Sequence, residues 1–94
     1  MQDLIPLKPL CLRLGLSIQH EIYRCQKLGL EVVSIRHPAL DGRMRNCSAI
    51  TRQGATMWLA VIAEASLQPT TKLCRPERKQ IANSITAELR SVNT

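Results

Sequence analysis

The sequence is poor in aromatic residues, with only Tyr23 and Trp58 and no Phe. This scarcity disfavours nucleic-acid binding by stacking of bases on aromatic side chains, and it requires an aliphatic core. The longest apolar run, Ala55–Ala63, is too short to span a bilayer. The first residues lack the basic leader and long apolar run of a signal peptide. We therefore expect a cytoplasmic protein with no membrane partner.

The sequence also lacks the residue spacings on which metal and catalytic sites depend. No C-x-x-C pair occurs, which excludes zinc-finger spacing. Of the two histidines, His20 is a sequence neighbour of Glu21, and neighbours point about 100° apart on a helix, so they form no dyad. We expect no catalytic, metal-binding or cofactor-binding residues, no enzymatic activity, and reduced thiols at the four cysteines, which are Cys11, Cys25, Cys47 and Cys74.

Positive charge is in excess, with 13 Lys and Arg against 7 Asp and Glu, a formal net charge of +6. A basic balance favours nucleic acid, an acidic partner or an anionic surface as the binding target. The length of 94 residues predicts one modest core that buries roughly 60–65% of the unfolded surface, so a partner subunit would help stability.

Two short helical patterns fill the stretch Lys8–Leu30. We predict helices over Lys8–Leu16 and Ser17–Leu28, with Gly15 in the left-handed conformation that ends the first and the Ser17 hydroxyl capping the second. Gly29 is expected to end the second helix, whose apolar stripe comprises Ile18, Ile22, Cys25 and Leu28. A tight helix–turn–helix of this kind is either a DNA-reading element or a plain structural corner.

A β-hairpin is predicted after these helices. Leu30–His37 is rich in β-branched residues and Met44–Ile50 alternates, which favours two strands. Asp41-Gly42 between them is a strong hairpin-turn dipeptide. Residues 1–7, which contain Pro6, are expected to be extended.

A third helix is predicted after Thr51, its possible cap, with a core face formed by Gly54, Trp58, Val61, Ile62 and Ala65. Residues 67–75 form a linker, and a fourth helix begins at Pro76. Its narrow apolar stripe predicts either a self-association helix or a helix that folds back on the core; the stripe comprises Ile81, Ile85, Leu89 and Val92. The expected organisation is a domain over residues 1–66, the linker, and the C-terminal helix over 76–94.

These elements predict an α+β fold with two N-terminal helices, a hairpin, a third helix and a C-terminal association helix. A helix–turn–helix followed by a hairpin is also the order of a winged helix. The hairpin and its flanks are basic, as a wing that touches phosphates would be. The polar face of the second helix either contacts bases or is simply solvated. A winged-helix regulator, similar to an excisionase or a small repressor, is therefore one functional hypothesis.

Three motifs carry a resemblance to a known family. They are Lys8-Pro9-Leu10-Cys11 followed by Leu14-Gly15-Leu16, Asp41-Gly42-Arg43 followed by Arg45, and Trp58-Leu59 followed by Ile62. In this order and spacing, over Ile5–Ile62, the chain resembles the N-terminal domain of temperate-phage antirepressor proteins. Ser17-Ile18 stands where that family often has Asp-Trp, and one helix replaces the long C-terminal domain of larger members, as in a minimal antirepressor.

The resemblance implies a protein that binds a phage repressor without covalent change, releases it from its operators and so induces the prophage. No direct DNA binding is then expected, and the protein would be a homo-oligomer, a dimer or tetramer. The candidate contacts to an acidic patch of the repressor are Arg36, Arg43 and Arg45, although a solvated turn explains these arginines equally well. The stripe of the fourth helix is the candidate for self-association.

Overall fold

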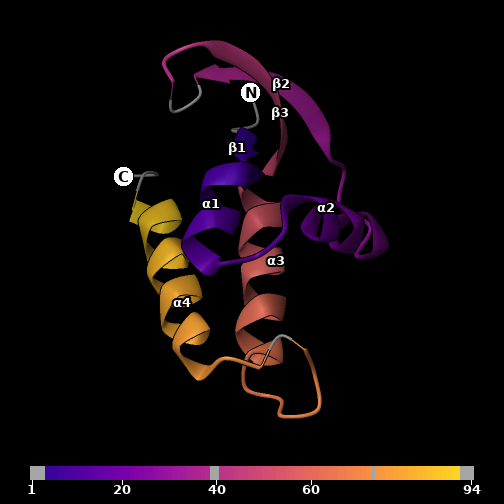
Figure 1. The fold of residues 1–94 in the computed structure, drawn as a ribbon, viewed down its shortest axis with the longest axis vertical. Helices are drawn as coiled ribbons and strands as arrows, with labels where there is room; N and C mark the ends of the chain where they lie inside the picture. Colours follow the sequence, from indigo (N-terminus) through magenta and orange to yellow (C-terminus); the bar gives the residue numbers. More distant parts are fainter. Residues whose placement is uncertain (1–3, 39–40, 73, 92–94) are drawn as a thin grey trace. The chain divides into compact units, whose positions relative to one another are not determined.

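The structure is a computed structural model that describes residues 4–38, 41–72 and 74–91. The chain divides into two compact units, Met1–Arg52 and Gln53–Thr94. The first contains β1 (Leu4–Pro6), α1 (Leu7–Leu14), α2 (Ile18–Lys27), β2 (Val33–Pro38) and β3 (Met44–Thr51), and the second is made from α3 (Arg52–Ala65) and α4 (Pro76–Ser91) (Figure 1).

The sheet of the first unit is antiparallel and has the strand order β1-β3-β2. β2 and β3 form the predicted hairpin, in which Arg36 opposes Asn46 and His37 opposes Arg45. β1 pairs with the other edge of β3, where Leu4 opposes Thr51. Of the stretch 1–7 expected to be extended, residues 4–6 form this third strand, Leu7 already belongs to α1, and residues 1–3 lie outside the described residues. β3 lies in the centre of the sheet.

The two glycines predicted to end the N-terminal helices do so. Gly15 has φ 70° after α1, and Gly29 has φ 83° after α2. The backbone N–H of Leu16 donates to Cys11 at 2.9 Å, and that of Leu30 donates to Cys25 at 2.9 Å, which satisfies carbonyls at both helix ends.

The predicted side-chain cap at Ser17 is wrong. Ser17 occupies the N-cap position of α2 with extended backbone angles, but its side chain makes no capping hydrogen bond. The backbone carbonyl of Ser17 accepts from the N–H of Glu21 at 3.1 Å, so the first helical bond forms without the hydroxyl. The sequence therefore predicted that Ser17 precedes the first helical residue, but not the orientation of its exposed hydroxyl.

The buried side chains of the first unit are mainly aliphatic, as the lack of aromatics predicts. Both Cys11 of α1 and Cys25 of α2 are buried and act as small apolar groups. One charged residue joins them: Glu21 is only 1% exposed. The other members of this buried set are Leu7, Leu10, Leu14, Ala49 and Ile50.

α3 and α4 of the second unit run antiparallel to each other (Figure 1). The connection between them is closed by the backbone N–H of Arg75, which donates to the carbonyl of Ser66 at 3.0 Å. Trp58 is fully buried, as predicted. The remaining predicted face of α3 is buried or half-buried, and Ala55 and Leu59 are buried beside it.

The apolar stripe of α4 is largely covered within the single chain. Ile85 is 1% exposed, and Ile81 and Leu89 are half-buried, while Val92 lies outside the described residues. The stripe therefore already has a packing role, which is the fold-back alternative of the sequence analysis. Association through the same side chains stays a prediction, and Ile85 would have to leave its present packing to take part.

The predicted boundary at residues 67–75 falls inside the second unit, between α3 and α4. The third helix thus groups with the C-terminal helix, and the Arg75–Ser66 hydrogen bond lies in the connection between them. The α+β class and the order of the predicted elements are confirmed. No helix in the part of the chain that the structure describes combines the length and apolar character needed to cross a membrane.

Candidate functional site

A groove of about 390 Å³ opens in the first unit between α1 and the hairpin. Its apolar lining comes from the junction of β1 with α1 and from both strands of the hairpin, and its polar lining comes mainly from the hairpin. The lining residues are Pro6, Lys8, Pro9, Leu12, His37, Pro38, Asp41, Arg45, Asn46 and Cys47.

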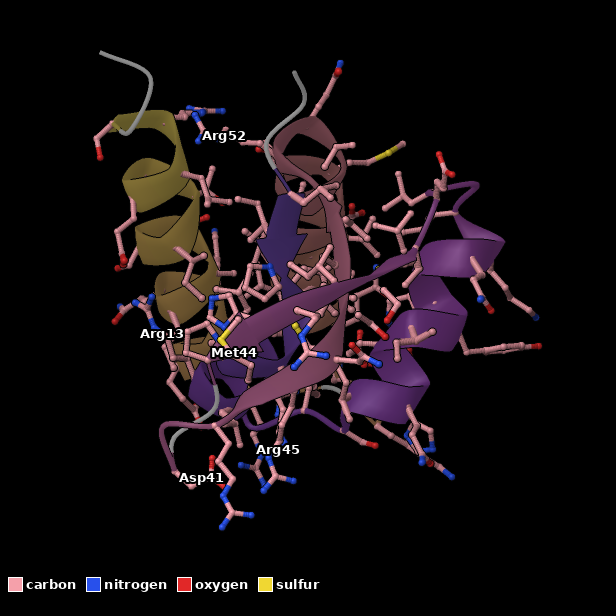
Figure 2. All side chains as sticks on the ribbon, turned by 90° about the horizontal axis from the view of Figure 1, so that it is seen from above. Arg13, Asp41, Met44, Arg45 and Arg52 are labelled. Carbon is pink, nitrogen blue, oxygen red and sulfur yellow. The ribbon has the colours of Figure 1, made fainter. Side chains whose placement is uncertain are left out.

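Asp41 organises the polar end of this groove. Its Oδ1 accepts a hydrogen bond from the backbone N–H of Arg43 at 3.0 Å, and its Oδ2 accepts from Nη2 of Arg45 at 2.6 Å (Figure 2). The Arg43 hydrogen bond first, and then that of Arg45, lower the pKa of the Asp41 carboxyl below its usual value, and the charge of Lys8 acts in the same direction. The carboxylate therefore holds the turn and the Arg45 side chain together.

The α1 side of the groove presents one apolar and one cationic side chain. Leu12 is 62% exposed, the largest exposed fraction among the large hydrophobic side chains of the described residues. It lies off the buried face of α1, and it shares the groove lining with Lys8 one turn earlier. This side of the groove therefore offers an apolar contact and a positive charge within one turn of helix.

The three arginines proposed as partner contacts do not form one patch. Arg45 lines the groove, and Arg43 adjoins it through its backbone contact with Asp41. Arg36 opposes Asn46, one residue along from the pair of His37 and Arg45, and successive residues of a strand point to opposite faces. Arg36 is therefore directed to the other face of the hairpin from Arg45.

The groove residues that the sequence analysis missed are Lys8, Leu12 and His37. A signal for Leu12 was present, because it is an apolar residue placed outside the helical stripe of its neighbours. Lys8 stands in the Lys8–Cys11 motif, but no local signal marks it or His37 as a contact residue, since the groove exists only when α1 and the hairpin come together.

The exposed face of α2 has few cations available for phosphate contacts. The Nε of Arg24 donates to Oε1 of the buried Glu21 at 2.8 Å, which ties this side chain to the helix. The Nζ of Lys27 lies 4.9 Å from the centre of the Tyr23 ring, a cation–π contact on the exposed face. Phosphate contacts by Lys and Arg supply much of the affinity of DNA-binding proteins, and on α2 these two cations already make contacts within the helix.

The two buried thiols are unsuited to nucleophilic chemistry. Burial first, and then the nearby Glu21 carboxylate, raise the pKa of Cys11 to about 12 and that of Cys25 to about 11. The thiolate is the reactive form, and these shifts keep both groups protonated near neutral pH. Among the described residues, no three His, Cys, Asp or Glu side chains gather in a way that could hold a metal ion.

Comparison of the chain with models of protein families, with curated proteins and with solved structures found no match. The candidate site therefore depends on the chemistry of the groove and on the positions of the three motifs in the fold.

Proposed function

We propose that the protein is a phage antirepressor that binds a prophage repressor non-covalently and prevents or reverses its operator binding, which promotes prophage induction. One observation carries the proposal. Lys8 and Pro9 belong to one motif of the antirepressor resemblance, Asp41 and Arg45 belong to another, and all four line the same groove. Two segments far apart in the sequence thus supply one groove with both apolar and charged lining residues.

The charge of the protein limits how it would act. A chain with a net charge of +6 is no decoy for a DNA-reading surface, which requires an acidic mimic. The proposed antirepressor therefore holds its repressor through a surface other than the DNA-reading one, and it spreads or clamps the subunits. Dimeric repressors are sensitive to such a change because their two DNA-reading helices must match the spacing of the operator half-sites.

The proposed site of action is the cytoplasm of the host bacterium, with a homo-oligomer, a dimer or tetramer, as the active form. Several copies of one binding surface would raise the effective concentration for a dimeric repressor. Analytical ultracentrifugation of the full chain tests this part, because a monomer at all concentrations would contradict it.

A mobility-shift assay tests the proposed function. The repressor of the same prophage is bound to its labelled operator, and the purified protein is then added. Release of free operator DNA, without a shifted band containing the protein alone with DNA, supports the proposal. An unchanged repressor–operator band at saturating protein would refute it.

The order of elements favours a second candidate function, a winged-helix DNA-binding regulator. β1 precedes the two helices, the hairpin follows them, and the sheet order is β1-β3-β2, which is the arrangement of a winged helix. A salt series separates the two functions, since DNA affinity that falls steeply with salt indicates phosphate contacts. Specific protection of an operator by the protein alone would favour this second function.

A further inference from the structure

The groove between α1 and the hairpin combines features that select one kind of ligand. The apolar part of its lining includes Pro9, Leu12 and Cys47, and Lys8 and Arg45 supply positive charge. Leu12 leaves most of its side chain in contact with solvent, so a ligand with an apolar group would gain by covering it.

Arg45 is held in place for a second contact. Its Nη2 donates to Asp41 Oδ2 at 2.6 Å, and Asp41 is itself fixed by the backbone N–H of Arg43. A guanidinium has five N–H donors, so the contact with Asp41 leaves others for a ligand. Because the side chain is already oriented, less conformational entropy is lost when a carboxylate binds to it.

From these features we propose that the groove is the docking site for a segment of the repressor that carries an apolar side chain next to carboxylates. The apolar side chain packs on Leu12, and the carboxylates contact Lys8 and Arg45. This inference rests on the proposed antirepressor function and adds the location and chemistry of the contact.

Charge complementarity favours an acidic polypeptide over nucleic acid in this groove. Among the Lys, Arg, Asp and Glu residues of the lining, Lys8 and Arg45 are opposed by Asp41 alone, which leaves one net positive charge. A phosphate backbone would also meet these cations, but it has no apolar group to cover Leu12. A peptide segment satisfies both the apolar and the charged lining.

Two pairs of matched variants test the proposal in the full chain. Lys8→Glu reverses a charge in the groove, and Lys27→Glu makes the same change on the exposed face of α2. Leu12→Glu introduces a carboxylate at the apolar lining, and Met57→Glu does so at another exposed apolar side chain, in α3. All four side chains are exposed, so circular dichroism should show an unchanged fold for each variant.

Affinity for the purified repressor is then measured by fluorescence anisotropy. The two groove variants should weaken binding at least about tenfold, as expected for loss of a central contact. The two matched variants should bind within about twofold of the unaltered protein. If the repressor binds and the groove variants retain full affinity, the groove assignment is overturned while the antirepressor function stands.

The remaining outcomes also decide the matter. If the repressor does not bind the unaltered protein, both the proposed function and the docking proposal fail. If operator DNA binds in place of repressor, and Lys27→Glu abolishes this binding, α2 is a DNA-reading helix and both fail. If Lys8→Glu lowers the oligomer mass with repressor affinity retained, the groove is occupied by a second copy of this chain, and the docking proposal is wrong.

Asp41→Asn tests the orientation of Arg45 separately. This variant removes a negative charge from the groove, so a simple positive patch would bind an acidic segment more tightly. Loss of the Asp41 carboxylate also releases the Arg45 guanidinium from its position. We expect weaker binding by about threefold or more; equal or tighter binding would overturn the role of Arg45 as an oriented contact.

Discussion

Replacement of Ile85 by Ala tests whether the apolar stripe of α4 serves the fold of a single chain. The Ile85 side chain is 1% exposed, so the substitution removes buried methyl groups and leaves a cavity. Such changes cost about 2–5 kcal/mol. A chain of 94 residues has a total stability of about 5–14 kcal/mol, so the loss would be a large part of it.

Urea denaturation followed by Trp58 fluorescence measures this loss directly. Trp58 is the single tryptophan, it is fully buried, and it lies in the same unit as Ile85. With an m-value of about 1–1.5 kcal/mol/M, expected for a small domain, the unfolding midpoint should fall by roughly 1.5 M or more. Met57→Ala is the control, since Met57 is 50% exposed, and it should change stability by less than about 0.5 kcal/mol.

Association through the stripe would give a different result. If Ile85 lay at an interface between two copies, Ile85→Ala would leave the unfolding midpoint of the dilute monomer unchanged and would lower the mass measured by light scattering. The unfolding midpoint of the unaltered protein would then depend on protein concentration. That combination would refute the reasoning from burial, because it would mean that Ile85 packs mainly against another copy.

Three further predictions concern the glycine turn, the buried thiols and the hairpin turn. Gly29→Ala should lower the free energy of unfolding by about 1 kcal/mol and Gly29→Asn by less, as judged by thermal melts, because the space is open but φ is +83°; equal stability of all three would contradict this. Iodoacetamide labelling at pH 8 with mass spectrometry should modify Cys47 and Cys74 well before the buried Cys11 and Cys25, and early labelling of the buried pair would argue against their burial. The raised thiol pKa values also mean that their contribution to stability is complete below the ordinary value of 9.0 and is lost as pH rises toward about 11 and 12. The Asp41 carboxyl has a lowered pKa, so its contribution to the stability of the fold is present above the ordinary pKa of 3.8 and is lost as pH falls through the lower pKa of the folded state. The NMR signal of the Arg43 amide should therefore titrate with a midpoint below pH 3.8. A midpoint at or above pH 3.8 would rule out the turn contacts.

The local elements of the fold were predictable because each has a local cause. Gly15 and Gly29 end their helices through the backbone conformation that glycine adopts without strain. Asp41-Gly42 marks the hairpin turn, since the Asp side chain accepts from the backbone two residues ahead. These signals depend on neighbours in sequence, so no tertiary information was needed.

Long-range features were not predictable in the same way. The strand at Leu4–Pro6 is too short for a pattern, and it exists because β3 offers an unpaired edge to it. Glu21 is a charged residue in a buried position, and its ion pair with Arg24 offsets part of the cost of that burial. Helical spacing places Glu21 on the same face as Ile18 and Cys25, but its charge gives no signal that the side chain is buried there.

The candidate site was predicted only in part for the same reason. Arg45 was named from the basic character of the hairpin, but the contact that orients it depends on Asp41. Arg36 was grouped with Arg45 by sequence, although the strand register directs them to opposite faces. Lys8 and Leu12 enter the site because α1 lies opposite the hairpin, and no local pattern contains that information.

The pairing of Leu4 with Thr51 brings the entry and exit points of the first unit next to each other. A module whose two attachment points are adjacent can be inserted into a surface loop of a host protein, or circularly permuted, with little change to either partner. A graft of the first unit would therefore need only a short gap in its host loop, and β1 would close it as the strand beside β3.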